Sequence, residues 1–496
     1  MSRVGCDCAR DSADAGSSRT VRSATWSVRS CLWLVVATLV LGACGGGAER
    51  SVSGSGAERR VQASWPTFGR DLENSRYQPH ETDLSPSSVR NLEVSWEVDG
   101  LRGVTSTPLV DEGVVYIGDY TGSVRAFEAR TGEELWATKL PGDVLYGSVA
   151  LAEDLVVAAD RAGNVVALER SDGDVVWSVR ADEQQGAIVF ASPVVVEDRV
   201  LLGVGSAQNF FPVDDFTFRG NLAAFDLKKG RELWRTHFTD GVKSGAGVAV
   251  WSTPAVDLKR RMVFVGTGQH YEPPANELSD AVVALDLDSG RVLWSHQYTR
   301  GDVRDFAGRG GDGPDADVGA GPNLFEAEGR QLVGAGDKAG RYKALDRETG
   351  EEAWSARLTR GGLLGGVEAT AAVGDGTIFV ASNVADPTSR TPSGESQLIA
   401  LDAADGRVLW RRDLEGSVFG SPSVAGGVVF QGTDAGWMMA FDATSGRRIW
   451  RHKAPGGVAG GPAIVDGTVW WGYGFYIFSP AREQVGGLLA FRLGGR

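Results

Sequence analysis

The side chains best suited to redox, metal or covalent chemistry are scarce in this sequence. All four cysteines lie within the first 44 of 496 residues: they are Cys6, Cys8, Cys31 and Cys44. The chain after Cys44 therefore has no disulfide, no thiolate metal site and no Cys-x-x-Cys-His haem attachment, and its stability must come from packing. The five histidines show no zinc-ligand spacing: they are His80, His237, His270, His296 and His452. No phosphate-binding loop or dinucleotide fingerprint is present either.

Cys44 is the one cysteine whose surroundings indicate a modification. Residues 31–43 form an apolar run behind an arginine-bearing segment, too short to span a bilayer and typical of a signal peptide. The run ends in Leu-Gly-Ala-Cys, which resembles a bacterial lipobox. We therefore expect a signal peptide at 1–43, a lipidated Cys44 and a flexible tether at 44–62, rich in Gly and Ser. An ordinary signal peptide with a chance cysteine is the alternative.

These assignments predict an exported protein. It would be anchored by lipid to the outer face of the bacterial cytoplasmic membrane, or in the periplasm or at the cell surface. The formal net charge of −14 argues against nucleic acid as a partner, because binding a phosphate backbone needs a basic surface. A basic substrate or redox partner, or simply a solvated acidic surface, is compatible with this charge.

One repeated phrase dominates the chain after the tether. In every copy an alanine precedes a tryptophan by ten residues, and a glycine precedes the same tryptophan by four. Such regularity indicates a repeat architecture. The seven copies lie at 126–136, 167–177, 224–234, 284–294, 344–354, 400–410 and 440–450.

The phrase has the features of a β-hairpin. An alternating strand ends in an acidic residue that can hydrogen-bond turn amides, the glycine permits a positive φ, and the next strand carries the tryptophan. A further pair of strands precedes most copies, as in TPLVDEGVVYIGD (107–119). Each unit therefore has four antiparallel strands, which is typical of a propeller blade.

Two half-phrases decide the number of blades. Trp96 has no Ala-Leu-Asp strand before it, and GLLAFRL (487–493) has no tryptophan after it. Pairing these two strands completes an eighth copy. The sequence therefore predicts an all-β fold over 63–496: a single eight-bladed β-propeller of four-stranded antiparallel blades, closed by its N- and C-terminal strands. The repeat tryptophans are expected to pack between blades.

The repeats resemble the tryptophan-docking repeats of pyrroloquinoline-quinone (PQQ) dehydrogenases, and residues 64–495 are most similar to the polyvinyl-alcohol dehydrogenase branch. The matching passages outside the repeat are WPTFGRDLENSR (65–76), VWSTPAVDLKRRMVFVGTGQ (250–269), GDVRDFAGRGGDGPDADVGAGP (301–322) and GAGDKAGRYKALD (334–346). The resemblance implies a quinone bound at the axial face of the propeller, beside a calcium ion that polarises it.

The resemblance also implies roles for three residues. Trp251 corresponds to the tryptophan on which PQQ stacks, Asp305 to the base that takes the alcohol proton, and Lys338 to the basic residue on the quinone oxygens. Each side chain suits its role: the flat indole of Trp251 can stack on a quinone, the carboxylate of Asp305 can accept a proton, and the cation of Lys338 can stabilise negative charge on the quinone oxygens. Each residue also has a purely structural interpretation: Trp251 could cap a blade, Asp305 could form a turn, and Lys338 could be a solvated lysine in a turn.

The expected calcium ligands depart from the family pattern. The family's glutamate is expected in the loop 205–215, where this chain has Gln208 followed by Asn209. The amide ligand corresponds to Gln269, and Asp305 would complete the set. Calcium prefers six to eight oxygens, several of them charged, so this site looks weakened. Asp214 or Asp215 would have to compensate.

Two further departures affect the cofactor. The family's arginine in the second blade corresponds to Tyr146, and its tryptophan after Glu368 is replaced by Ala369. The resemblance predicts an enzyme that oxidises a primary or secondary alcohol, possibly polymeric, by hydride transfer to PQQ. Since no haem motif is present, electrons would leave through a separate acceptor. The alternative is a non-catalytic propeller lipoprotein that acts as a protein-binding or assembly scaffold.

Overall fold

The computed structural model describes residues 64–211, 215–239, 246–308, 311–475 and 485–494. In these ranges the regular structure consists of strands and two short 3-10 helices, η1 (Val89–Asn91) and η2 (Ala207–Asn209). None of the described helices is long and apolar enough to cross a membrane. The predicted signal peptide, Cys44 and tether lie outside the described residues.

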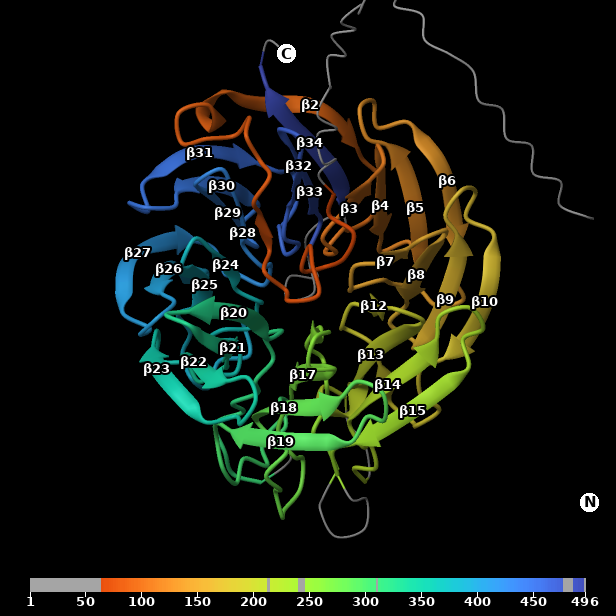
Figure 1. Cartoon of the computed structure of the whole chain (residues 1–496), viewed down its shortest axis with the longest axis vertical. Helices are drawn as coiled ribbons and strands as arrows, with labels where there is room; N and C mark the ends of the chain where they lie inside the picture. Colours follow the sequence, from red (N-terminus) through yellow and green to blue (C-terminus); the bar gives the residue numbers. More distant parts are fainter. Residues whose placement is uncertain (1–63, 212–214, 240–245, 309–310, 476–484, 495–496) are drawn as a thin grey trace, which may run out of the picture. The chain divides into compact units, whose positions relative to one another are not determined.

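Eight antiparallel sheets are arranged as blades around a central axis (Figure 1). In the first seven blades the strands run in chain order from the axis outward. The first blade consists of β3 (Leu109–Asp111), β4 (Val114–Gly118), β5 (Ser123–Glu128) and β6 (Glu134–Lys139). The second consists of β7 (Ala150–Ala152), β8 (Leu155–Ala159), β9 (Asn164–Glu169) and β10 (Val175–Arg180). The third consists of β12 (Val194–Val196), β13 (Arg199–Ser206), β14 (Asn221–Asp226) and β15 (Glu232–His237), and the fourth of β16 (Ala255–Asp257), β17 (Met262–Gly266), β18 (Ala281–Asp286) and β19 (Val292–Gln297).

The next three blades continue the pattern. The fifth blade consists of β20 (Asn323–Ala327), β21 (Arg330–Gly336), β22 (Arg341–Asp346) and β23 (Glu352–Arg357). The sixth consists of β24 (Ala372–Gly374), β25 (Thr377–Asn383), β26 (Glu395–Asp402) and β27 (Val408–Glu415). The seventh consists of β28 (Ser423–Ala425), β29 (Val428–Gly432), β30 (Trp437–Asp442) and β31 (Arg448–Lys453). Two short strands, β1 (Tyr77–Gln78) and β11 (Ala187–Ile188), add to the seventh and third blades. The predicted eight-bladed all-β propeller is confirmed.

The eighth blade combines strands from opposite ends of the chain. Three come from the C-terminal end: β32 (Ala463–Val465), β33 (Thr468–Tyr473) and β34 (Gly487–Leu493). The outer strand β2 (Leu92–Val98) comes from the N-terminal end and pairs antiparallel with β34, with Trp96 opposite Ala490. This is the pairing that the two half-phrases predict.

The repeat tryptophans dock each blade on the next. Trp136, for example, donates its indole N–H to the carbonyl of Arg170 at 3.1 Å. Its ring covers Gly173 of the following phrase, where a Cβ atom would lie 2.6 Å from the indole. Gly173 also has a φ of +78°, so glycine is required there both for space and for backbone conformation. The predicted packing between blades is confirmed.

An N-terminal strap, residues 65–78, connects the innermost strands. Trp65 exchanges two backbone hydrogen bonds with Val110, and Gln78 donates its side-chain amide to the carbonyl of Ile464. Between them, carbonyls of the strap accept N–H groups of Leu151, Val256, Leu324, Val373 and Val424. The strap thus pairs with the inner edges of seven of the eight blades, edges that would otherwise be unpaired.

Candidate active site on the propeller axis

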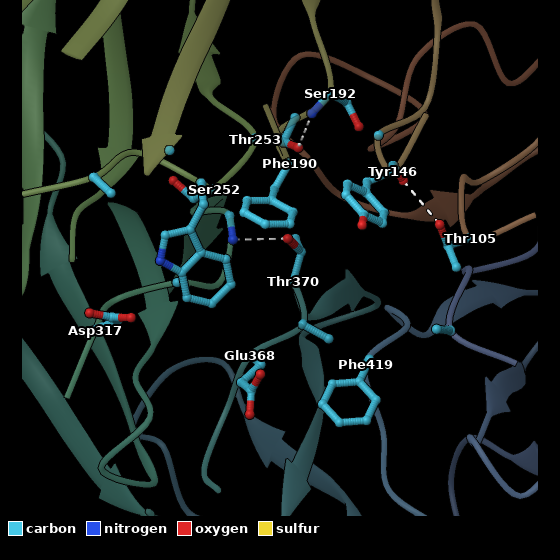
Figure 2. A pocket seen from close by; sticks show the side chains of 18 of the residues that line it. Thr105, Tyr146, Phe190, Ser192, Ser252, Thr253, Asp317, Glu368, Thr370 and Phe419 are labelled. Carbon is cyan, nitrogen blue, oxygen red and sulfur yellow. Dashed lines mark hydrogen bonds between the residues drawn. The ribbon is translucent and has the colours of Figure 1, made fainter. Parts of the chain in front are cut away.

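A cavity of about 280 Å³ lies where the eight blades converge. Segments that lead into the innermost strand of every blade contribute to its lining, and Phe68 of the strap contributes as well. Backbone N–H groups of one segment donate to hydroxyls of the next, for example Ser148 N to Ser192 Oγ at 2.9 Å. Ser192 N donates likewise to Thr253 Oγ1 at 3.2 Å (Figure 2). These bonds hold the lining in a fixed geometry around the axis.

Trp251 forms part of the wall of this cavity and lies four residues before the start of β16. The edge of its indole touches Gly319, and a Cβ atom at 319 would lie only 1.8 Å from the ring. No larger residue fits at this position while the indole stays in place. The segment that carries Gly319 also carries Asp317, so the position of the indole and that of the carboxylate are coupled.

A carboxylate and a lysine meet beside this indole. Asp317 lines the cavity, accepts the backbone N–H of Gln269 at 3.0 Å, and lies 3.6 Å from the ammonium of Lys338. Lys338, in the turn between β21 and β22, is also held by Asp315 at 2.7 Å. Burial lowers the pKa of this lysine, but the nearby carboxylates outweigh that effect and hold it above its usual value. The ammonium therefore stays charged across the physiological range.

Asp315 lies behind Asp317. Its second oxygen accepts the amide N–H of Gln269 at 2.9 Å, and its φ of +58° marks a left-handed backbone. Burial raises its pKa to about 7, although Lys338 opposes the shift. This carboxyl orients the lysine and the glutamine.

A second carboxylate lines the cavity from another blade. Glu368 belongs to the segment before β24, which is fixed by the bond from Val367 N to the Asp337 carbonyl at 2.9 Å. Oε1 of Glu368 is buried and has no hydrogen-bond partner among the described residues. Burial raises the pKa of Glu368 to about 8; Asp315 and Asp317 add to the rise, and Lys338 and Asn383 oppose it.

Aromatic rings supply much of the remaining wall. Tyr146 stacks on Phe190 at 5.1 Å between centroids, and Phe190 and Phe210 continue the series at 6.1 Å. Figure 2 shows Tyr146 and Phe190 on one side of the cavity, with Phe419 and Glu368 on the other. The cavity therefore offers apolar walls with a small set of polar groups, the usual composition of a small-molecule site.

The structure brings four of the predicted site residues together and places two elsewhere. Trp251, Lys338, Gln269 and Tyr146 line the cavity. Asp305 is fully buried and is not part of the lining, which has Asp317 in its place. We therefore replace Asp305 by Asp317 as the candidate base.

Gln208 is the other residue placed outside the lining. Its amide oxygen accepts the N–H groups of Thr217 and Phe218, each at 3.0 Å, and its amide nitrogen donates to Gln185 O and Thr217 Oγ1. These bonds occupy the amide in fixing its own loop. A metal or cofactor role for Gln208 therefore finds no support in the geometry.

Comparison with known proteins identifies the family. The model PQQ_2, described as "Outer membrane protein assembly factor BamB", matches residues 87–277, 278–365 and 338–474. The chain belongs to this PQQ-propeller family. The relationship suggested by the repeats is thereby confirmed.

Several dehydrogenases are relatives of this PQQ propeller. Polyvinylalcohol dehydrogenase of a Pseudomonas species is 30% identical over 380 residues, which are 70% of this chain and 58% of the relative. Quinohemoprotein alcohol dehydrogenase ADH IIB of Pseudomonas putida is 25% identical over 65% of this chain and 51% of its own. The chain thus spans somewhat more than half the length of these relatives.

Among solved structures, the quinohemoprotein alcohol dehydrogenase of Comamonas testosteroni has the same fold as this PQQ propeller. It superposes with a TM-score of 0.74 at 20% identity, and the match covers 88% of this chain and 81% of the other.

A quinone of the PQQ type suits the donor set. Trp251 presents an aromatic surface and Lys338 presents a cation. Hydroxyl groups that line the cavity can add hydrogen-bond donors: Thr107, Ser148, Ser192, Thr253, Thr370 and Ser421. The hydroxyls of Thr105, Ser106 and Ser252 also lie in the lining, but they already donate to the carbonyls of Tyr146, Gly118 and Gly266. Trp251, Lys338 and the first set of hydroxyls would hold the group.

Calcium does not suit this PQQ propeller. Within the described ranges no three His, Cys, Asp or Glu side chains are arranged to hold a metal ion. The ammonium of Lys338 lies between Asp315 and Asp317, where it already neutralises negative charge. Of the predicted ligands, Gln208 and Asp305 are outside the lining, and the amide oxygen of Gln208 already accepts the N–H groups of Thr217 and Phe218. The described residues therefore do not fit calcium, which prefers six to eight oxygen ligands.

Proposed function

We propose that this protein is a PQQ-dependent alcohol dehydrogenase-like quinoprotein that acts on neutral primary or secondary alcohols. The observation that carries the proposal is the meeting of Trp251, Asp317 and Lys338 at one cavity on the propeller axis. An aromatic platform, a base and a fixed cation are the groups that a quinone and an alcohol require.

The chain's own residues would act as follows. Asp317, oriented by the N–H of Gln269 and by Lys338, takes the hydroxyl proton as the substrate C–O bond becomes a carbonyl. PQQ, when bound, supplies the acceptor for the hydride that leaves the carbinol carbon, and both electrons pass on to a separate acceptor. Lys338 stabilises negative charge near Asp317. Tyr146, Phe190 and Phe419 enclose the apolar part of the substrate.

Reconstitution tests this proposal. The mature protein is loaded with PQQ and supplied with small neutral alcohols and an artificial electron-accepting dye. Dye reduction is expected to require both PQQ and alcohol. Trp251→Ala should weaken PQQ binding roughly tenfold or more by removing the stacking surface, whereas Trp251→Phe should retain most of the affinity. Bound PQQ without any alcohol-dependent dye reduction would contradict the assignment as a dehydrogenase.

A protein-binding or assembly scaffold is the second candidate. The description of the matched family favours it, as do the alanine at position 369 and the absence, among the described residues, of a cluster that could hold a metal ion. Failure of the wild-type protein to bind PQQ under any condition would support this candidate.

The proposed location is outside the cytoplasmic membrane, with a lipid anchor at Cys44. The Leu-Gly-Ala-Cys motif at 41–44 supports it. Radiolabelled fatty acid is expected to label the wild-type protein and not Cys44→Ala, because the thiol receives the lipid. Equal labelling of the two proteins, or an unlabelled wild type, would exclude this anchor.

A further inference from the structure

The charges around the cavity are unfavourable for an anionic cofactor. Among the described residues that line it, Lys338 is the sole basic side chain, and Asp317 and Glu368 are carboxylates. Lys338 is already paired with Asp315 at 2.7 Å and lies 3.6 Å from Asp317. PQQ carries carboxylate groups itself, and the arrangement contains no calcium site to balance them. A neutral proton donor in place of a further negative charge would therefore favour binding.

Glu368 is the group in position to supply it. The carboxyl lines the cavity with Leu363 and Leu364 nearby in the same lining, and its Oε1 is buried without a partner in the described structure. A buried, unpartnered oxygen is costly for an ionised carboxylate, whereas a neutral carboxyl group loses less on burial and gains an O–H donor. Asp315 and Asp317 disfavour a further negative charge in the same region.

We propose that Glu368 binds the cofactor as a neutral carboxylic acid, donating its O–H to an anionic or carbonyl oxygen of the quinone, so that PQQ binds without a divalent cation. This inference rests on the proposed function, because it assumes that PQQ occupies the cavity. The retained proton takes over the charge-balancing role, since the described residues contain no cluster of acidic or imidazole side chains that could hold calcium.

The groups that face Glu368 determine how binding depends on pH. They are Lys338 from the β21–β22 turn, Asp315 and Asp317 from the segment before β20, and the Asn383 amide from β25. Lys338 stays charged throughout, since its pKa is raised. The pKa values of Glu368, about 8, and Asp315, about 7, lie in the accessible range. A ligand that needs protonated Glu368 loses affinity about tenfold per pH unit above the pKa of that group.

The matched variant is Glu368→Gln, which keeps the size and an N–H donor but cannot titrate. PQQ binding is measured by the absorbance of the bound quinone from pH 6 to 9.5, with a chelator present. Wild-type Kd is expected to rise about tenfold per pH unit above roughly pH 8, relative to the variant. The ratio of the wild-type Kd to the Kd of the variant at each pH isolates the titration of Glu368. The titration of PQQ affects both proteins equally and cancels in this ratio, and most of the effect of Asp315 cancels for the same reason.

Three outcomes would overturn the inference. A constant ratio of the two Kd values across this pH range would exclude a titrating Glu368. Binding that requires added calcium would exclude the cation-free site. In both of these cases PQQ binds and the proposed function stands, whereas a failure of PQQ to bind at any pH would overturn both.

Thermal unfolding without ligand gives an independent measurement. The pKa of Glu368 is raised in the folded protein, so the folded state binds the proton more tightly than the unfolded state. The stability associated with that proton is present below about pH 4.5 and is lost as pH rises towards about 8. The Tm of the wild type should therefore fall relative to that of Glu368→Gln over this interval. Parallel Tm curves would contradict a neutral Glu368.

Discussion

Replacing Asp317 by Asn is expected to lower kcat for alcohol oxidation by about 10²–10⁴-fold, the usual cost of losing a general base. Asn keeps the size of the side chain and can still accept the N–H of Gln269, which the carboxylate accepts at 3.0 Å. PQQ affinity should change much less, because Trp251 and Lys338 remain. Steady-state dye reduction at saturating PQQ measures kcat, and quinone absorbance measures the affinity.

Asp305→Asn is the informative comparison for this variant. Asp305 and Asp317 belong to the same glycine-rich segment, but only Asp317 lines the cavity. If Asp317 is the base, Asp305→Asn should retain far more of kcat in protein that has folded. A larger loss of kcat in Asp305→Asn than in Asp317→Asn would restore the assignment made from sequence resemblance.

Deleting residues 486–496 is expected to destabilise the propeller by about 5 kcal/mol or more. The deletion removes β34, whose Leu488, Leu489 and Phe491 are at most 1% exposed. Burial of each large apolar side chain is worth about 1.5–3 kcal/mol. It also unpairs β2 on one side and β33 on the other, which exposes two strand edges. Because domains are stable by only about 5–15 kcal/mol, unfolding or aggregation should follow.

The matched control is a chain that ends at Leu493. It retains every register pair of β2 with β34, and among the described residues it loses one backbone bond, from Gly494 N to the Asn91 carbonyl. Its Tm should lie close to that of the full chain. Equal Tm values for the full chain and for the chain lacking 486–496 would contradict the role of β34 in the eighth blade.

The architecture could be predicted because the repeat encodes it locally. The spacing of Ala, Gly and Trp specifies a hairpin, and the glycine must be small since a tryptophan of the preceding blade covers it, as Trp136 covers Gly173. Trp251 and Tyr146 were found through the resemblance to PQQ dehydrogenases, and the structure places both on segments that lead into innermost strands and line the cavity.

The chemistry within the loops could not be assigned in this way. Residues 301–322 contain several aspartates with no repeat to orient them, and the assignment of Asp305 as the base rested on the resemblance alone. A signal was present in the small residues after Asp317, because Gly319 is required against Trp251. For Glu368 the sequence showed only the altered phrase ending in Ala369. The burial of its Oε1, and the lack of a hydrogen-bond partner for that atom among the described residues, depend on tertiary packing.

Anaerobic reduction of the bound quinone tests the central claim most directly. Wild-type protein is loaded with PQQ in the presence of a chelator, and a small neutral alcohol is added without any electron acceptor. The oxidised-quinone absorbance is expected to disappear in a single turnover, with one carbonyl product formed per PQQ, and to do so at least about a hundredfold more slowly in Asp317→Asn. Bound quinone that stays oxidised in the wild-type protein with every alcohol tried would contradict the account.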